Sequence, residues 1–95
     1  METTDQPAYA VPAHVLYREV DGEMVLLNLD SEQYFGLDTV GADIVTRLVE
    51  QPLDKALTTL VADYEVDPAV LRRDVDDLLA ALLDVGLLER TEPPG

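Results

Sequence analysis

The spacing of hydrophobic residues changes once along the chain. Residues 14–37 follow a strand-like pattern of short, largely apolar segments separated by turn residues, and over residues 39–86 apolar positions recur every three or four residues, as in helices. The proline-containing ends, residues 1–12 and 91–95, follow neither period, and we expect a flexible N-terminal arm and a flexible C-terminal tail. The folded domain is therefore expected to span residues 13–90.

The strand-like part predicts a three-stranded antiparallel β-meander. Asp21-Gly22 separates residues 14–20 from residues 23–29, and it is a strong hairpin signal because glycine accepts a positive φ. A second turn, Asp30-Ser31-Glu32, precedes a short third strand over residues 33–37. Such a sheet is marginal alone, so we expect helices to cover one of its faces.

The helical part predicts three α-helices. Asp38 or Thr39 can cap the first helix, and Gln51-Pro52 ends it, because the residue before proline disfavours the α conformation. Pro52 then suits the first turn of the second helix. Asp67-Pro68 begins the third helix and Gly86 ends it. Three strands followed by three helices give an α+β fold, with a winged helix-turn-helix-like arrangement in which the meander is the wing.

The third predicted helix carries two apolar stripes. The stripe expected to face the core consists of Leu71, Val75, Leu78, Leu82 and Val85. A second stripe contains Leu79 and Leu83, and Arg72 and Asp76 extend it toward the N-terminus. A helix that faces one core needs a single stripe about 100° wide. The second stripe therefore either packs on the meander or lines one wall of a hydrophobic groove.

The third predicted strand could form the other wall of that groove. If the strands lie in chain order, residues 33–37 (QYFGL) form an edge of the sheet, and they carry no charge. Edge strands are usually blunted by lysine, proline or a bulge. The edge is thus either covered by a helix or open to an extended peptide, which would add to the sheet as a further strand.

Charge and composition narrow the possible functions. The chain has 6 Lys and Arg against 20 Asp and Glu, a net charge of −14, which disfavours nucleic acids and anionic membranes as partners. There is no cysteine, and the one histidine, His14, cannot build a histidine-based zinc site. No apolar run is long enough to cross a membrane, and METTDQPAYA contains no apolar signal segment. We expect a cytoplasmic protein.

Carboxylates are the only abundant reactive groups. The densest cluster, Asp74, Asp76 and Asp77, is flanked by arginines and is typical of a solvated helix face. The turn at residues 30–32 lacks the pattern of a calcium loop, and no glycine-rich phosphate loop is present. We therefore expect no enzyme activity, no metal site and no cofactor.

The order of these segments resembles the PqqD family over about residues 14–89. The resemblance is carried by VLLNLDSEQYFGLDTVGADIVTRL, with Tyr34-Phe35-Gly36-Leu37-Asp38 and then Gly41. It continues in VLRRDVDDLLAALLDVGLLE, with Asp74-Val75, Leu79, Leu82, Gly86 and Leu87. PqqD-like domains are recognition elements for ribosomally made, post-translationally modified peptides (RiPPs). This short, acidic, stand-alone form is similar to the leader-binding proteins of lasso-peptide biosynthesis clusters.

The resemblance implies a non-catalytic adaptor that binds the leader segment of a lasso-peptide precursor as an added β-strand. The implied partners are a cysteine protease that removes the leader and a cyclase that closes the core peptide, and the free protein is expected to be a monomer. Leaders of this group tend to carry a tyrosine and, three residues later, a proline. The implied peptide-binding residues are Gln33, Tyr34, Phe35, Gly36 and Leu37 on the third strand, and Arg72, Asp76, Leu79 and Leu83 on the third helix.

Three alternatives remain open at the level of sequence. The break at residues 65–68 also suits a winged-helix DNA-binding regulator, although the acidic third helix has the wrong charge for a recognition helix. The apolar edge could instead be buried in an obligate oligomer. Some PqqD-like chains act in cofactor or radical-enzyme pathways rather than with lasso peptides.

Overall fold

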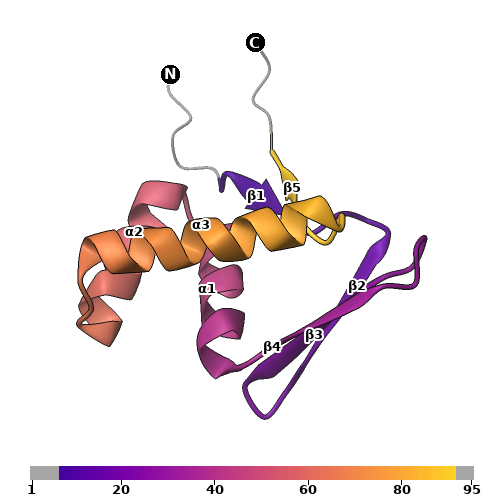
Figure 1. Ribbon diagram of the computed structural model, residues 1–95, viewed down its shortest axis with the longest axis horizontal. Coiled ribbons are helices and arrows are strands. Elements are labelled where there is room, and N and C mark those ends of the chain that lie inside the picture. Colours follow the sequence, from indigo (N-terminus) through magenta and orange to yellow (C-terminus); the bar gives the residue numbers. More distant parts are fainter. Residues whose placement is uncertain (1–6, 92–95) are drawn as a thin grey trace.

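The computed structural model describes residues 7–91 and shows a three-stranded sheet followed by three helices (Figure 1). The elements are β1 (Tyr9–Ala10), β2 (Val15–Val20), β3 (Glu23–Asn28), β4 (Tyr34–Leu37), α1 (Thr39–Glu50), α2 (Leu53–Tyr64), α3 (Pro68–Asp84) and β5 (Glu89–Arg90). The predicted α+β class and the antiparallel meander are confirmed.

The main sheet is antiparallel with the strand order β2-β3-β4. Asp21 and Gly22, which join β2 to β3, both have positive φ values, 55° and 85°, as a type I′ turn requires. The sheet turns Met24, Leu26 and Leu37 toward the helices, where all three side chains are buried. Because β2 and β4 are the outer strands, each has one edge without a neighbouring strand in this sheet.

Local capping explains where the helices begin. The side chain of Asp38 accepts a hydrogen bond from the Gly41 amide at 2.8 Å, so Asp38 rather than Thr39 caps α1. Asp67 likewise accepts from the Ala69 amide at 2.8 Å, and Pro68 occupies the first turn of α3, as predicted. Pro52 lies at the cap position before α2 rather than inside its first turn, a shift of one residue from the prediction.

The C-terminus of α3 is closed by a Schellman motif. The amide of Gly86 donates to the carbonyl of Leu83 at 3.2 Å, and the amide of Leu87 donates to the carbonyl of Leu82 at 2.9 Å. Gly86 has a φ of 74°, which confirms its predicted role as the helix stop. The turn places Leu87 and Leu88 in the core, where both are buried.

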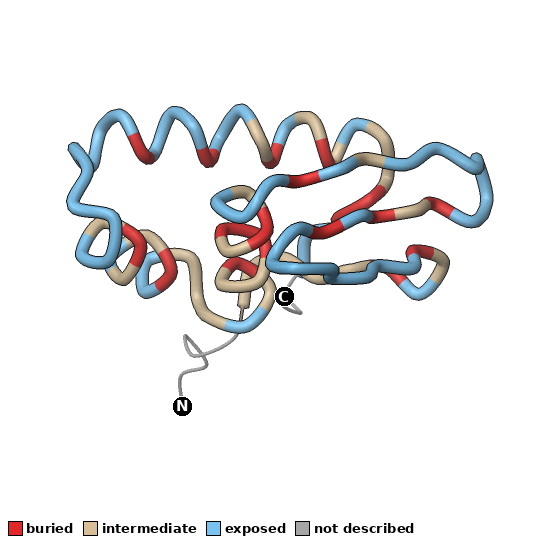
Figure 2. Tube along the Cα trace, turned by 90° about the horizontal axis from the view of Figure 1, so that it is seen from below, coloured by how far each residue is buried: buried red, intermediate tan, exposed pale blue. Residues whose placement is uncertain are grey.

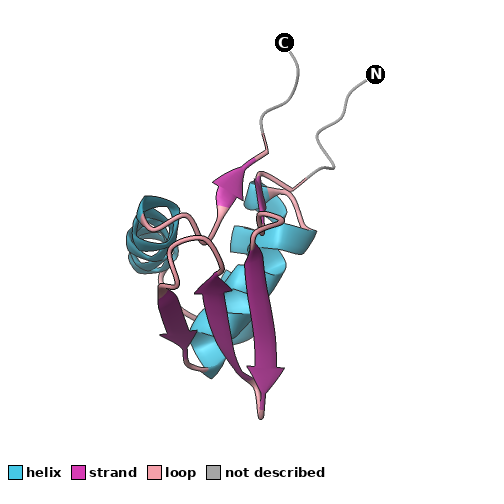
Figure 3. Ribbon diagram, turned by 90° about the vertical axis from the view of Figure 1, so that its right-hand side faces the viewer, coloured by secondary structure: helices cyan, strands magenta, loops and turns pink. Residues whose placement is uncertain are grey.

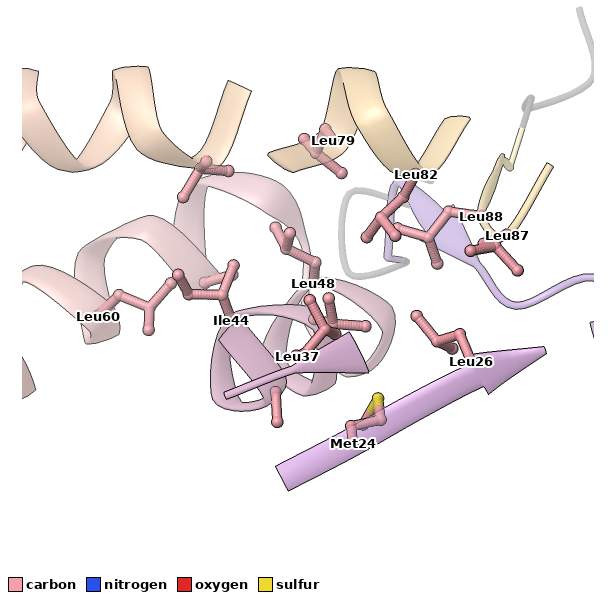
Figure 4. Packing of buried hydrophobic residues seen from close by; sticks show 14 of the residues in the cluster. Met24, Leu26, Leu37, Ile44, Leu48, Leu60, Leu79, Leu82, Leu87 and Leu88 are labelled. Atoms are coloured by element: carbon pink, nitrogen blue, oxygen red, sulfur yellow. The ribbon is translucent and has the colours of Figure 1, made fainter. Parts of the chain in front are cut away.

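The core lies between the inner face of the sheet and the helices. Figure 4 shows Leu79 and Leu82 of α3 on one side, Met24 and Leu26 of β3 on the other, and Leu48 of α1 between them. In Figure 2 the buried positions of α3 all lie on one side of the helix. One continuous apolar cluster therefore joins the sheet to α1 and α3.

The two ends of the described chain are part of the fold. Tyr9 pairs with Arg90 in the β1–β5 ladder, and the amide of Thr91 donates to the carbonyl of Ala8 at 2.9 Å. Tyr9 and Val11 also pack against the core. The expectation of loose ends thus fails for residues 7–12 and for Thr91, because side-chain packing and backbone pairing hold them, while the rest of the expected arm and tail, residues 1–6 and 92–95, lies outside the described residues.

Candidate functional site

The outer edge of β4 presents unpaired backbone groups. The amide of Asn28 in β3 donates to the carbonyl of Gln33 at 2.8 Å, which fixes the register of the β3–β4 ladder. Backbone groups alternate in direction along an antiparallel strand. The N–H and C=O groups of Tyr34 and Gly36 therefore point away from β3, and these four groups form an edge that can bind another strand.

Gly36 lies in the middle of this edge without a local reason to be glycine. Its φ is not positive, and a Cβ atom added there would meet nothing within 4 Å. A glycine inside a strand often marks the close approach of another backbone. The other free edge, on β2, carries the charged Arg18 and Glu19, a common way of blunting an edge. The β4 edge is thus the better candidate for strand addition.

Helix α3 lies beyond the free edge of β4, next to that strand. In Figure 2, β4 is the strand next to α3, with β3 and then β2 farther away, and Figure 3 shows the same order from another direction. An extended segment added to β4 would therefore lie between β4 and α3.

A largely apolar pocket of about 270 Å³ lies between the three helices, with Val40 near the start of α1 in its wall. It is lined by Val40, Ile44, Leu60, Tyr64, Val66, Val70, Leu71 and Asp74, which come from all three helices and the α2–α3 turn. Val40, Val66 and Val70 are large apolar residues that remain 37–47% exposed. Since an apolar cavity of about 150 Å³ can hold benzene, this pocket has room for an aromatic side chain.

A polar network fixes α1 against α2 beside this pocket. Arg47 of α1 forms ion pairs with Asp43 at 2.9 Å and with Asp63 of α2 at 2.6 Å, and the hydroxyl of Tyr64 donates to Asp43 at 2.7 Å. The hydrogen bond from Arg47 lowers the pKa of the Asp43 carboxyl, and the bond to Asp43 raises the pKa of Tyr64. The network holds Tyr64 in the wall of the pocket.

The predicted site residues around β4 have different environments. Tyr34 is 74% exposed and Gly36 is open at the edge. Phe35 is half-buried and packs against the core, and Leu37 is 7% exposed within it. Gln33 precedes β4, and its carbonyl is already bonded to Asn28. Tyr34 and Gly36 are thus the members of this group with free backbone groups, while Leu37 offers no accessible side chain.

The predicted rotation of α3 needs correction. Leu79 is 5% exposed and belongs to the core stripe with Leu71, Val75 and Leu82, whereas Leu78, expected in that stripe, is only half-buried. The second stripe was expected either to pack inward or to line a groove, and Leu79 packs inward. Leu83 is half-buried against the same core.

The remaining predicted α3 residues, Arg72 and Asp76, do not line the apolar pocket beside α1. Arg72 pairs with Asp76 at 3.2 Å, with both side chains more than half exposed, and Arg72 lines a separate hollow of about 350 Å³ between α2 and α3. Since a helix turns about 100° per residue, Arg72 and Asp76 flank one side of the buried stripe and Val70 and Asp74 flank the other. Val70 and Asp74 line the pocket beside α1.

The sequence prediction missed Val40, Val66 and Val70 as site residues. The sequence feature that could have identified them is an apolar side chain outside the stripe that each helix turns toward the core. Val66 is also apolar although it lies in a turn, where polar residues are usual. The pocket becomes visible only once three helices are brought together.

No three His, Cys, Asp or Glu side chains come together as metal ligands within residues 7–91. None of the helices in this part of the chain has the length and apolar character that crossing a membrane requires.

Comparisons with solved structures identify close relatives of this fold. A chain described as TbiB1 in complex with the TbiA(beta) leader peptide is 35% identical, with a TM-score of 0.79, and the match covers 88% of this chain and 99% of that one. A lasso peptide synthetase B1 complexed with the leader peptide is 26% identical, with a TM-score of 0.78, and the match covers 86% of this chain and 98% of that one. Among curated proteins, none matches.

A family model supports the resemblance seen in the sequence. The model of coenzyme PQQ synthesis protein D (PqqD) matches residues 23–88, which include the whole of β3, β4 and the three helices. The chain belongs to the PqqD family.

Proposed function

We propose that this protein is a non-catalytic adaptor that binds the leader segment of a lasso-peptide precursor and delivers it to a leader peptidase. The observation that carries the proposal is the open edge of β4, where the backbone groups of Tyr34 and Gly36 face the side occupied by α3. The two solved relatives were both determined with leader peptides, which supports the same class of ligand for this chain.

The β4 edge supplies affinity that depends little on peptide sequence. An added strand could form up to four backbone hydrogen bonds with Tyr34 and Gly36, and each such bond contributes about 1 kcal/mol net. In strand addition, backbone bonds provide affinity and pockets for alternate side chains provide specificity. The absence of a side chain at Gly36 leaves room for the incoming backbone.

The apolar pocket beside α1 supplies specificity. An aromatic anchor such as the tyrosine found in lasso leaders would bury its ring against Val40, Val66 and Val70. A few buried anchors usually dominate the energy of such an interface. The carboxylate of Asp74 at the pocket, together with the net charge of −14, favours leaders that carry lysine or arginine.

The adaptor can deliver the precursor to the peptidase because it holds the leader segment and leaves the core peptide free. A peptidase that contacts the adaptor meets a precursor at high effective concentration, because the second binding event becomes intramolecular. The chain contains no cysteine, so the nucleophile of a cysteine protease must come from the partner. In this account the adaptor contributes binding and orientation, and the partner performs the reaction.

The DNA-binding alternative gains no support from the surface of α3. Asp74, Asp76, Asp77 and Asp84 are all exposed on this helix, against Arg72 and Arg73. Acidic side chains at this density repel phosphate groups.

The test replaces Gly36 by proline and measures leader binding by calorimetry. The Gly36 amide faces away from β3, so Gly36→Pro removes a donor from the free edge without removing a bond of the β3–β4 ladder. We expect the affinity for a synthetic leader peptide to fall at least tenfold, which corresponds to about 1.4 kcal/mol.

The matched control is Glu19→Pro on the opposite edge. By the same alternation the amide of Glu19 faces away from β3 on the β2 side, so the two variants remove equivalent groups from the two edges. Glu19→Pro should bind the leader as the wild type does. Equal affinities for both variants and the wild type would show that the leader does not add to β4.

A further inference from the structure

The face of the sheet that points away from the helices is largely apolar. This outer face consists of Leu16, Arg18 and Val20 on β2, Glu23, Val25 and Leu27 on β3, and Tyr34 and Gly36 on β4. Figure 3 looks onto it, with helices behind the sheet and α3, seen nearly end-on, to the left of β4. Leu16, Val20, Val25 and Tyr34 are 47–74% exposed. Leu16, Leu27 and Tyr34 form one continuous row across the three strands.

Such a face is unusual for an antiparallel sheet with one covered side. Strands of this kind normally alternate apolar residues toward the core with polar residues toward water. In β3, however, Met24, Val25, Leu26 and Leu27 form an unbroken apolar run, a pattern typical of a strand covered on both faces. Met24 and Leu26 are buried by the core, while Val25 and Leu27 lie on the opposite face. Contiguous exposed apolar patches of this kind mark interaction sites.

We propose that the outer face is the docking surface for the enzyme that processes the bound peptide, and that this enzyme presents an apolar patch bordered by lysine and arginine. The proposal rests on the proposed function, because it names the partner that meets the loaded adaptor. It assigns the outer face a role separate from the β4 edge and the pocket.

The charges around the outer face select the kind of partner. Asp21 in the β2–β3 turn and Glu23 at the start of β3 lie at one end of the sheet, and Asp30 and Glu32 in the β3–β4 turn lie at the other. A second copy of this chain would bring these carboxylates and two net charges of −14 together. An anionic lipid surface would be repelled in the same way. A basic border on another protein is the arrangement that these charges complement.

The position of the outer face also connects it to the peptide. A strand added to β4 would extend the same sheet, and every second side chain of that strand would stand on the outer face next to the row of Tyr34. An enzyme docked there would contact adaptor and peptide at once. It should therefore bind the loaded adaptor more tightly than the free one.

The experiment uses the purified leader peptidase as the probe and measures two affinities by calorimetry. The first is that of the adaptor for a synthetic leader peptide, and the second is that of the peptidase for the leader-loaded adaptor. Val25→Glu places a charge in the centre of the outer face, whereas Ala62→Glu places the same charge on an exposed position of α2. We expect Val25→Glu to weaken peptidase binding at least tenfold with leader binding unchanged, and Ala62→Glu to change neither.

Each result separates the two proposals. Peptidase binding that survives Val25→Glu, in a variant that still binds the leader, would overturn the docking surface. A wild-type protein that binds no leader would overturn the proposed function instead. A wild-type dimer in sedimentation that Val25→Glu converts to a monomer would mean that a second copy covers the face, which also overturns the proposal. If Val25→Glu does not fold, Leu16→Thr, which keeps a strand-forming residue at a position 53% exposed, replaces it with the same expectations.

Discussion

The side-chain amide of Asn28 donates a hydrogen bond to the carbonyl oxygen of Val85, 3.1 Å away, and so joins the end of β3 to the end of α3. The same side chain accepts hydrogen bonds from the amides of Asp30 and Ser31 at 2.9 and 3.1 Å. Asn28 is only 6% exposed and is the buried polar residue of the described core. It therefore fixes the β3–β4 turn, and with it the start of β4, relative to α3.

Asn28→Ala should destabilise the protein by about 3 kcal/mol, because three hydrogen bonds of about 1 kcal/mol each are lost in a buried position. Urea denaturation measures the change. Ser31→Ala is the control, since the contacts of that exposed hydroxyl with Gln33 are 3.4 Å long, and it should change stability by no more than about 0.5 kcal/mol. Equal stabilities for Asn28→Ala and wild type would contradict this role.

Gly86→Ala should cost about 1–2 kcal/mol, because an L-residue is strained at the φ of 74° found there. The added Cβ would also lie 3.1 Å from the Asn28 side-chain nitrogen and press on the bond to Val85. Gly36→Ala provides the comparison, as its Cβ meets open space, and thermal unfolding should show little or no loss of stability. Similar losses at both glycines would argue against a specific strain at Gly86.

The Asp43–Arg47 pair predicts a pH dependence of stability. Because the hydrogen bond from Arg47 lowers the pKa of Asp43 in the folded protein, the pair contributes fully above the ordinary aspartate pKa and is lost as the pH falls through the lower folded value. Asp43→Asn should therefore cost stability at pH 7, about 1 kcal/mol for a partly exposed pair, and the difference from wild type should shrink below about pH 4. Urea midpoints measured against pH provide the test. A constant difference at all pH values would contradict it.

The side of α3 that contacts the leader can be identified with two variants. Val70 is 47% exposed and lines the pocket beside α1. The variant Val70→Asp places a second carboxylate next to Asp74 in this pocket. We expect the affinity for the leader to fall at least tenfold, or about 1.4 kcal/mol. Arg72→Ala changes the opposite side of the helix and removes only an exposed pair with Asp76, so leader affinity should be unchanged. Calorimetry that gave the reverse order would restore the groove side expected from the sequence.

Local signals in the sequence were sufficient for the order of the three strands of the main sheet and of the three helices. The Asp21-Gly22 turn, the Asp67-Pro68 start and the Gly86 stop each depend on the conformations open to one or two residues, and all three are confirmed. Residues 34–37 of the uncharged QYFGL segment also proved to be an outer strand, because strand order followed chain order.

The rotation of α3 could not be read in the same way. Leu78 and Leu79 are adjacent leucines about 100° apart on the helix, so the apolar positions cover too wide an arc to define a single stripe. Packing against the other elements buries Leu79 and leaves Leu78 at the margin. The pairing of Tyr9 with Arg90 was missed for a related reason, since strands of two residues have no measurable period.

Strand addition at β4 can be tested by hydrogen exchange of individual backbone amides, measured by NMR with and without a synthetic leader peptide. The amides of Tyr34 and Gly36 should exchange rapidly in the free protein and become protected when the leader binds. The amides of Tyr17 and Glu19 on the opposite edge should keep their rates. A leader that binds without protecting Tyr34 and Gly36, or that protects the β2 edge instead, would contradict strand addition at β4.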